Sequence, residues 1–306
     1  MRLYIKKRII CCLISCFIVI CVFPALSAAQ STGTTTVSTT SGLILTLDDA
    51  KERAVEHSNT LKKADNSIEQ GELNRDTAQD NVKYAPADGS DSEASSAFIK
   101  LIQSDISWQI TKKDKEVSLD SLEKEVFQKY TNVLTAQEKV KAAEKALKYA
   151  DFQRLAARVG YQVKNQSLIS KNTAERNYIT KELALAKNKN DLEDSYRSLN
   201  TLIGLDAKER PVLQDAPQFS AYEIDDLELQ VLRKIDIDPD IWKANKEVEK
   251  AKLSVDLYTY NSGDESYDVK ELAVENTELS VSDAKKQARD NVISAYNNIF
   301  NLEQQY

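Results

Sequence analysis

Four acidic residues in the second half of the chain have the spacing of a calcium-binding loop. Asp236, Asp238, Asp240 and Glu247 stand at relative positions 1, 3, 5 and 12, which supply oxygen ligands in such loops. The loop also needs Gly at position 6 for its sharp turn, and Ile241 stands there instead. Acidic residues are equally typical of a helix start, where Asp caps the first turn and favours the helix dipole. We therefore expect a helix cap here and no metal site.

Few other residues have types and spacing that could do chemistry. His57 is the only histidine, so it has no second histidine with which to hold a metal or form a catalytic pair, and we expect it at the surface. The polar segment 88–93 could hold a cation, but carboxylates alone do not make a site, and we expect a solvated loop. No nucleophile elbow, Walker loop or dinucleotide-binding fingerprint occurs. We predict no catalytic residue, no metal ligand and no cofactor, so the protein is not expected to be an enzyme.

Residues 1–29 have the three-part order of a secretory signal, with a basic start, an apolar run and small residues at the end. All four cysteines lie within this segment: Cys11, Cys12, Cys16 and Cys21. Cleavage after Ala28 or Ala29 would leave a chain without disulfides, thiolate metal sites or cysteine nucleophiles. Two alternatives stay open, because the apolar run is long enough to persist as an N-terminal anchor and 13–16 resembles a lipoprotein cleavage box. Pro24 and the small residues favour cleavage.

Glycine and charge set limits on fold and partner. The chain has 7 Gly and 5 Pro in 306 residues, and Gly160 is the only one of either type between residues 90 and 203. Sheets and tight turns use glycine, so the scarcity argues against an all-β or doubly wound α/β fold and favours long helices. The formal net charge is −7, and removing the four basic residues of 1–29 lowers it to about −11. An acidic chain is not expected to bind nucleic acid as its main partner.

The hydrophobic pattern predicts helices separated by short breaks. The longest predicted helix has residues at the heptad spacing typical of coiled coils. These residues form a seam, which we expect to continue to about Val159. The seam residues are Leu122, Val126, Lys129, Val133, Gln137, Val140 and Leu147. The expected helices are 46–84 with a pause at Ser58, 96–159, 167–203, 226–234, one that starts at Asp238, and 267–306. A break over 160–165 should fold the second and third helices into an antiparallel hairpin.

Two parts of the chain match at constant offsets and indicate an internal repeat. Residues 59–64 align with 239–244, and Val126, Tyr130, Asn132 and Val133 align with Val292, Tyr296, Asn298 and Ile299. We therefore expect five segments. They are a signal or anchor at 1–29, a Ser/Thr-rich linker at 30–45, a first helical-hairpin repeat at 46–206, a linker at 207–224 and a second, incomplete repeat at 225–306.

Three segments carry a resemblance to a known family. They are LTLDDAKERAVEHSNTLKKADNSIEQGE at 45–72, RVGYQVKNQSLISKNTAERNYITKELALAKNKNDLEDSYRSLNTLIGLD at 158–206, and the second copy from 225 onward. In their order and duplication the chain resembles the TolC-like outer membrane efflux proteins. The resemblance implies an all-α fold of long, coiled-coil-like antiparallel hairpins with a duplicated repeat, assembled as a trimer into a hollow α-barrel.

The resemblance also implies a docking site. In that family the hairpin tips dock on a periplasmic adaptor and an inner-membrane pump. The tip of the first hairpin here comprises Gly160, Tyr161, Gln162, Val163, Lys164, Asn165, Gln166 and Ser167. The family usually has Gly where Lys164 stands, and Asn165, which tolerates a left-handed backbone, follows it. The segments available for the family's membrane strands are short and polar, and the sequence ends in the first long helix of the second repeat, so we expect neither the strands nor the last helix.

Together these features predict an exported, oligomeric duct component of an envelope efflux or secretion system, located in the outer membrane or periplasm. A single hairpin buries its narrow seam only against a neighbour, which favours oligomerisation. Association with a membrane is left open. One alternative is a coiled-coil scaffold or adaptor in the cell envelope without a barrel, and another is a truncated, non-functional family member.

Overall fold

A computed structural model describes residues 43–86, 90–218, 224, 226–259 and 265–305. The chain divides into two units, Met1–Ser41 and Gly42–Tyr306. The predicted export signal, its cysteines and most of the Ser/Thr-rich linker lie outside the described residues. The fold described below is therefore that of the second unit.

Seven helices and two short strands are present among the described residues. In chain order they are β1 (Ile44–Leu45), α1 (Leu47–His57), α2 (Asn59–Asp80), α3 (Ser92–Gln162), α4 (Leu168–Leu202), β2 (Val212–Leu213), α5 (Leu227–Ile237), α6 (Pro239–Asp256) and α7 (Tyr267–Gln305). The predicted all-α fold of long hairpins is confirmed, because the only described strands are two residues long.

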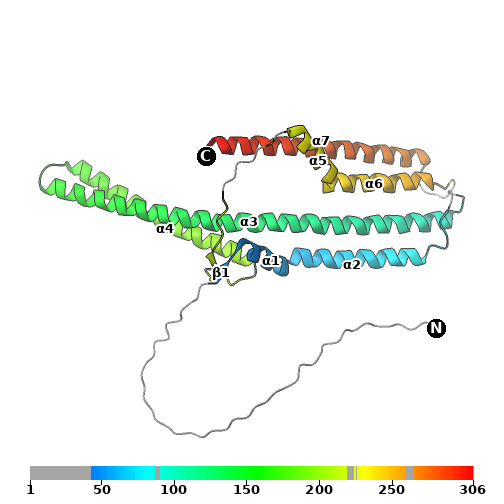
Figure 1. The fold of residues 1–306 in the computed structure, drawn as a ribbon, viewed down its shortest axis with the longest axis horizontal. Coiled ribbons are helices and arrows are strands. Elements are labelled where there is room, and N and C mark those ends of the chain that lie inside the picture. Colours follow the sequence, from blue (N-terminus) through cyan, green and yellow to red (C-terminus); the bar gives the residue numbers. More distant parts are fainter. Residues whose placement is uncertain (1–42, 87–89, 219–223, 225, 260–264, 306) are drawn as a thin grey trace, which may run out of the picture. The chain divides into compact units, whose positions relative to one another are not determined.

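The helices pack as antiparallel neighbours along α3 (Figure 1). The 71 residues of α3 span about 105 Å at 1.5 Å per residue, with α2 packed along one end and α4 along the other. In the second half of the chain α6 packs on α7, and α6 also contacts α3. An ion pair of 3.1 Å between the Lys243 Nζ and an Asp114 carboxylate oxygen lies in the α3–α6 contact.

Local capping explains where three of the helices begin. Thr46 accepts a hydrogen bond from the Asp49 N–H, and the Asp49 side chain accepts one from the Thr46 N–H, which completes a capping box for α1. Ser58 ends α1, and its hydroxyl accepts from the Leu61 N–H to begin α2. The predicted pause at Ser58 is therefore a change from one helix to the next.

Asp238 begins α6 in the way the sequence indicates. Its carboxylate accepts hydrogen bonds from the N–H groups of Asp240 and Ile241, with Pro239 at the first helical position. Burial by itself would raise the pKa of Asp238, but the bonds from Lys234 and from these N–H groups together lower it. The spacing that resembles a calcium loop is thus occupied by a helix cap, as predicted.

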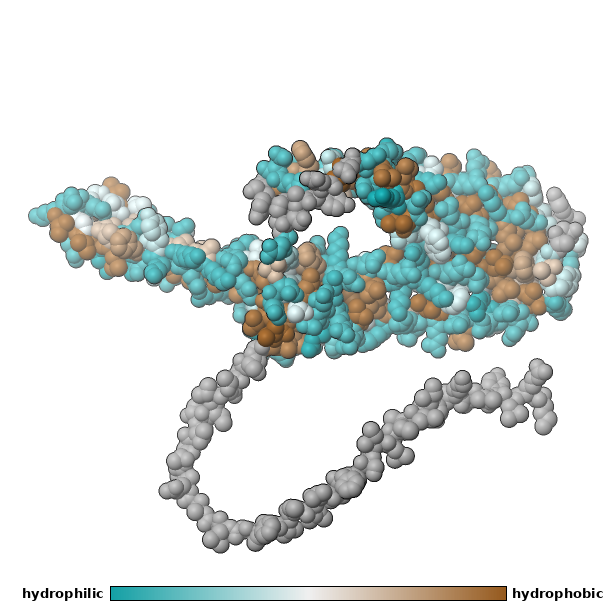
Figure 2. Space-filling view, viewed as in Figure 1, coloured by the Kyte–Doolittle hydropathy of each residue, from teal (hydrophilic) through white to brown (hydrophobic). Residues whose placement is uncertain are grey.

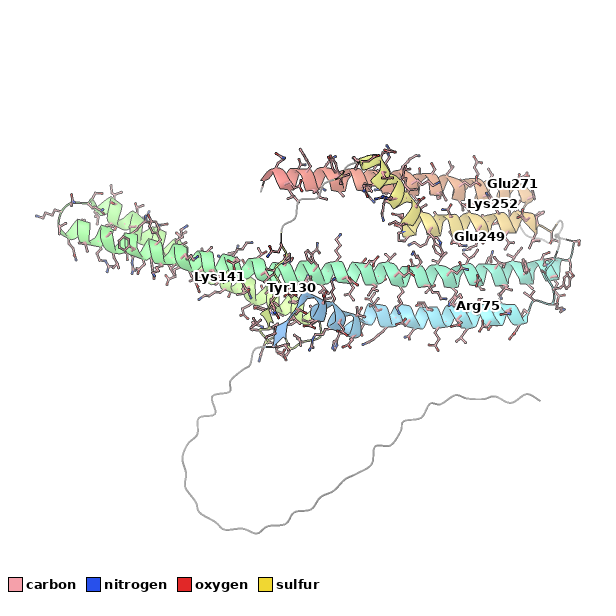
Figure 3. The ribbon with its side chains drawn as sticks, viewed as in Figure 1. Arg75, Tyr130, Lys141, Glu249, Lys252 and Glu271 are labelled. Atoms are coloured by element: carbon pink, nitrogen blue, oxygen red, sulfur yellow. The ribbon has the colours of Figure 1, made fainter. Side chains whose placement is uncertain are left out.

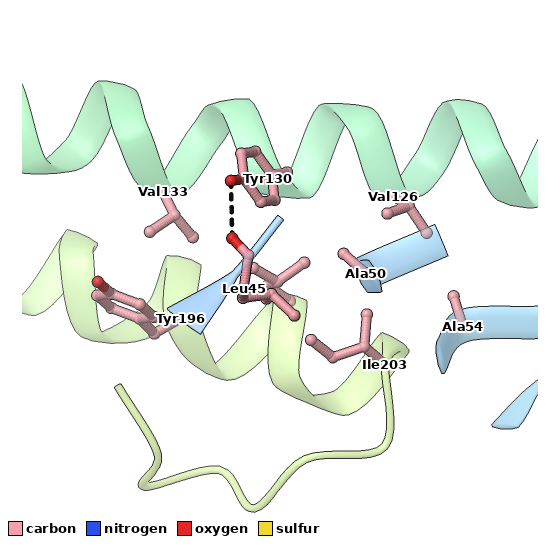
Figure 4. Close-up of a cluster of buried hydrophobic side chains, with 9 residues drawn as sticks. Leu45, Ala50, Ala54, Val126, Tyr130, Val133, Tyr196 and Ile203 are labelled. Carbon is pink, nitrogen blue, oxygen red and sulfur yellow. Dashed lines mark hydrogen bonds between the residues drawn. The ribbon is translucent and has the colours of Figure 1, made fainter. Parts of the chain in front are cut away.

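The two strands, which the sequence did not indicate, lie at the base of the long hairpin. Ile44 pairs with Val212 and Leu45 with Leu213 in a parallel arrangement. Leu45 enters a core formed by α1, α3 and α4 (Figure 4). The buried members of this base cluster are Leu45, Ala50, Ala54, Val126, Tyr130, Val133, Tyr196, Leu199 and Ile203. Leu45 from the segment predicted as a linker at 30–45, and Leu213 from the one predicted at 207–224, therefore contribute to packing.

Tyr130 connects the base cluster to both strand segments. Its ring is fully buried, and its hydroxyl donates to the Leu45 carbonyl at 3.0 Å (Figure 4) and accepts from the Asp215 N–H at 3.1 Å. The Asp215 carboxylate in turn accepts from the Leu47 N–H at 2.8 Å. Burial raises the pKa of the Tyr130 hydroxyl, which keeps it protonated and able to donate.

Two positions that the sequence repeat aligns have the same environment, and others do not. Leu61 and Ile241, each three residues after a capping side chain, are 5% and 4% exposed. Tyr130 is fully buried, whereas Tyr296 is only half-buried and Ile299 is exposed. The aligned stretch of α7 therefore has fewer packing partners among the described residues than its counterpart in α3.

Candidate functional site: the tip of the long hairpin

The tip connects α3 to α4 through a short turn. The carbonyl of Gly160 accepts hydrogen bonds from the N–H groups of Asn165 at 2.8 Å and Gln166 at 3.0 Å, which satisfies the last turn of α3. The hydroxyl of Ser167 then accepts from the Ser170 N–H and begins α4. The antiparallel hairpin is confirmed, with a tip where the sequence indicated it.

The turn uses a lysine in the left-handed region. Lys164 has a φ of 59° and is the only non-glycine residue with positive φ in the described part of the chain. The sequence suggested that Asn165 would ease this turn, but Lys164 adopts the left-handed conformation itself. The sequence predicted that the helix would break at Gly160, but α3 continues to Gln162. Gly160 instead leaves room for Gln166, whose Cγ would lie 2.9 Å from an added Cβ.

The tip is open to solvent. Residues 161–170 are all exposed, and Gly160 is half-buried. Val163 is 67% exposed and Tyr161 is 40% exposed. Figure 2 shows hydrophobic and hydrophilic residues mixed over this end of the hairpin. The eight predicted docking residues therefore form one accessible surface.

Below the tip, α3 and α4 meet along a seam of small side chains. Ala136, Ala150 and Ala157 are 6%, 1% and 5% exposed, and they repeat at multiples of seven residues. Small residues let two helices approach closely. Arg154 lies on this seam, with its guanidinium carbon 3.9 Å from the centre of the Tyr178 ring and an ion pair of 2.7 Å to Asp151.

A second apolar stripe runs along α3 on the side away from α4. Phe152, Leu155 and Val159 are 70%, 47% and 58% exposed. At 100° per residue, Phe152 and Val159 lie about 160–180° around the helix from Ala150. Val159 therefore does not continue the inner seam as predicted from the sequence; the seam passes through Ala157. The signal for the second stripe was present in the seven-residue spacing from Phe152 to Val159.

His57 and the segment 88–93 were the other places where the sequence suggested possible binding chemistry. His57 is exposed, lies in a cleft at the α1–α2 break, and packs near Gly204, whose φ is 71°.

Asp91 caps α3. Its pKa is lowered chiefly by the hydrogen bond from the Ala94 N–H and also by the hydrogen bond from the Tyr84 hydroxyl. Residues 87–89 lie outside the described part. Among described residues, no three His, Cys, Asp or Glu side chains are grouped to hold a metal.

No helix in the described ranges has an apolar stretch long enough to cross a bilayer. Near the tip, Arg158 and Glu175 pair at 3.5 Å across the hairpin. Besides Gly160 and Val163, the tip residues have hydroxyl or amide side chains and one lysine, all in open solvent.

Comparison with known proteins identifies the fold. No protein-family model and no curated protein sequence matches the chain. Solved structures do match. The chain is similar to the structure of CusC, described in terms of transmembrane channel formation, with a TM-score of 0.65 and 13% identity over 85% of this chain and 78% of that one.

Two further structures are outer-membrane proteins of named bacteria. The chain is similar to the outer membrane protein VceC from Vibrio cholerae, with a TM-score of 0.59 and 12% identity over 84% of this chain and 78% of that one. It is also similar to the outer membrane channel CmeC of Campylobacter jejuni, with a TM-score of 0.56 and 14% identity over 90% and 77% of the two chains. The TolC-like resemblance is thus confirmed at the level of the fold, and the structural neighbours are channel proteins, not enzymes.

Proposed function

From the TolC-like fold, we propose that the protein is an exported component of a helical duct for efflux or secretion across the cell envelope. The protein would assemble with further copies of itself, as a trimer by resemblance. The tip formed by residues 160–167 would dock on a periplasmic adaptor or inner-membrane pump. An outer-membrane or periplasmic location follows from the same resemblance.

The observation that carries the proposal is the pair of apolar faces on the distal part of α3. One face packs on α4 through Ala150 and Ala157, and the opposite face exposes Phe152 and Val159. A hairpin that is complete by itself has no need for this second face, because exposed apolar area of this kind is normally covered by a partner. Two opposite seams on one helix suit a helix that has neighbours on both sides, as in a closed ring of helices.

The return helix α4 has a similar outer face. Ile169, Ile179 and Leu183 are 79%, 48% and 67% exposed. Ile169 and Ile179 are ten residues apart and Ile179 and Leu183 are four apart, and these spacings keep all three within about 80° of one another on the exposed side of α4. Each hairpin therefore has one apolar edge on α3 and one on α4. Hairpins side by side would bury both edges, which supports a ring.

Light scattering of the chain from Gln30 onward, purified without detergent, tests assembly. We expect a trimer. The double variant Phe152→Ser/Val159→Ser should shift the protein to monomer while its helical circular dichroism stays unchanged, because both side chains are exposed in the single chain. The fold of each copy does not depend on them.

Leu73→Ser is the matched control, because it removes a side chain that is 61% exposed on α2, outside the long hairpin. It should leave the trimer intact. A wild-type chain that stays monomeric or dimeric at high concentration would contradict the duct and support the scaffold or adaptor function. Equal loss of assembly in Leu73→Ser would show that the hairpin stripe is not the interface.

A further inference from the structure

A groove opens between α3 and α6, at the end of α3 away from the hairpin tip. Its volume of about 520 Å³ falls within the range of about 300–1,000 Å³ that is typical of sites for drug-sized molecules. The apolar wall of the groove consists of Phe98, Ile102, Val248 and Leu253, all of them half-buried. This wall can take up the apolar body of a ligand.

The register of the two helices places an acidic residue beside the apolar wall. Helices α3 and α6 run antiparallel (Figure 1), and Lys243 pairs with Asp114 at 3.1 Å. Asp256 comes 13 residues after Lys243, so it lies opposite the stretch of α3 between Phe98 and Ile102. It is also the last residue of α6, whose last turn has no basic residue and carries the negative end of the helix dipole. A positive charge is therefore favoured at this end of the groove.

Carboxylates outnumber cations around the groove. A second hollow, of about 290 Å³, lies between α6 and α7 and shares Lys252 and Asp256 with the groove. Figure 3 shows Glu249, Lys252 and Glu271 close together where α6 meets α7. The charged residues that line the two hollows are one lysine, Lys252, and five carboxylates, Glu249, Asp256, Glu271, Glu275 and Glu278.

The lysine and two of these carboxylates are already in ion pairs. Lys252 pairs with Glu278, and Lys246 pairs with Glu249, each at 2.7 Å. The other three carboxylates, which we call the acidic strip, are exposed and have no ion-pair partner in the described part of the chain: Asp256, Glu271 and Glu275. The segment 260–264, which joins α6 to α7, contains no Lys or Arg. The acidic strip is thus available to a cation from outside the chain.

We propose that the groove binds an amphiphilic organic cation, which is a drug-sized molecule with an apolar body and one positively charged group. The body would lie against the apolar wall, and the charged group would lie at Asp256, attracted by the rest of the acidic strip. Burial of apolar area supplies most of the affinity in such a site, and the carboxylates select the sign of the charge.

Other small ligands fit the groove less well. A metal ion needs several coordinating side chains, and no three His, Cys, Asp or Glu are grouped to hold one among the residues that the structure describes. An anion would be repelled by the acidic strip, and a neutral apolar molecule would gain nothing from it. The groove is formed within one copy of the chain, so this ligand goes beyond the proposed function and does not depend on it.

Two ions with the same apolar body and opposite charge test the proposal. Tetraphenylphosphonium and tetraphenylborate are dialysed to equilibrium against the same detergent-free sample that is used for light scattering. We expect one tetraphenylphosphonium per chain, bound at least about tenfold more tightly than tetraphenylborate, because each exposed carboxylate near a cation contributes up to about fivefold. The preference should weaken as salt rises from 0.15 M to 1 M, because the Debye length falls from about 8 Å to about 3 Å.

Substitution of the acidic strip tests the selection by charge. Asp256→Asn/Glu271→Gln/Glu275→Gln should lower the preference for tetraphenylphosphonium over tetraphenylborate by at least about fivefold, because it removes three exposed carboxylates beside the groove. The apolar wall is unchanged in this variant, so tetraphenylborate should bind as well as before or better.

A matched variant controls for the change in net charge. Glu52→Gln/Glu56→Gln/Asp290→Asn also removes three exposed carboxylates, from parts of α1 and α7 that do not line the groove. It should retain the preference for tetraphenylphosphonium. Dialysis of both triple variants at the same salt concentration makes the comparison direct.

The apolar wall is tested by filling the groove and by removing part of its surface. Val248→Trp adds a large ring to the groove and should abolish the binding of both ions. Ile102→Ser should lower the affinity for both ions by about threefold to tenfold while the preference for the cation persists, because it removes apolar area and no charge. Circular dichroism and thermal unfolding check that each variant stays folded, and Val248→Trp decides if Ile102→Ser unfolds.

Four results would overturn the proposal. They are an absence of saturable tetraphenylphosphonium binding, equal affinity for the two ions, an equal loss of preference in the control triple variant, and unchanged binding in Val248→Trp. Binding that disappears when the protein assembles would also overturn it and would assign the groove to a second copy. Light scattering reports the trimer separately, so failure of the ligand site and failure of the duct function are distinguishable.

Discussion

The base and the distal part of α3 have similar apolar spacing and opposite environments. At the base, Val126, Tyr130 and Val133 are fully buried. Some twenty to thirty residues later on the same helix, Phe152 and Val159 are more than half exposed. The base residues are covered by β1, α1 and α4 together, and the distal part is covered by α4 on one side. The number of packing elements around a helix therefore decides whether an apolar stripe becomes a core or an interface.

The largest expected difference between the two regions is in the effect of aromatic truncation. Tyr130→Ala should lower the free energy of unfolding by about 3–5 kcal/mol, because it leaves a cavity in the base cluster and removes the hydroxyl that joins Leu45 to Asp215. Phe152→Ala, at a residue that is 70% exposed, should change it by less than about 0.5 kcal/mol in the isolated monomer. Urea unfolding followed by circular dichroism measures both.

If Tyr130→Ala and Phe152→Ala lower the free energy of unfolding by similar amounts, the contrast between the base and the distal part of α3 is wrong. It would mean that the distal stripe is already packed within a single chain. If Phe152→Ala is costly only at concentrations at which the protein assembles, the stripe is an interface and the comparison is sharpened.

The turn after α4 should be the next most sensitive position at the base. Gly204 has a φ of 71°, and an added Cβ would overlap the imidazole ring of His57. Gly204→Ala should therefore cost about 1–3 kcal/mol, in part from the left-handed backbone and in part from the contact with the imidazole. Thermal unfolding of the purified chain measures the loss.

His57→Ala provides the control for this contact. In that background Gly204→Ala should cost only the backbone part, about 1–2 kcal/mol. An identical cost in both backgrounds would show that the imidazole moves away freely and that only the backbone conformation matters.

The smallest expected effect is at the tip, and it has the opposite sign. Lys164→Gly should raise the free energy of unfolding by about 0.5–1 kcal/mol, because glycine adopts a φ of 59° without the steric cost that lysine has there. Asn165→Gly is the matched variant at a neighbouring position without positive φ, and it should lower stability slightly. Differential scanning calorimetry resolves the two directions; a loss of stability in Lys164→Gly would show that the lysine side chain stabilises the turn.

Most of the helices could be predicted from the sequence because their boundaries are set by local chemistry. Thr46 with Asp49, and Asp238 with Pro239, are helix starts that depend on three or four consecutive residues. The hairpin followed from the break after Gly160. These features need no knowledge of distant parts of the chain.

The base of the hairpin could not be predicted in the same way. The strands β1 and β2 have two residues each and come from segments far apart in the sequence, so neither has a recognisable period of its own. The buried hydroxyl of Tyr130 bonds to both segments, and the sequence indicated this residue only as part of a repeat. On the distal part of α3, the exposed stripe through Phe152 and Val159 was missed because one apolar seam was expected where α3 has two.

The parallel pairing of β1 with β2 has a mechanical consequence. The chain runs into β1 at Leu43 and leaves β2 at Asp215. Two backbone hydrogen bonds, from the Val212 N–H to the Leu43 carbonyl and from the Gln214 N–H to the Leu45 carbonyl, join the two strands. A pull on the chain before β1 and after β2 would load these parallel strands in shear, so that their bonds resist together and not one after another. Tension would thus pass directly between the two chain exits, and the long hairpin between them would carry none of the load.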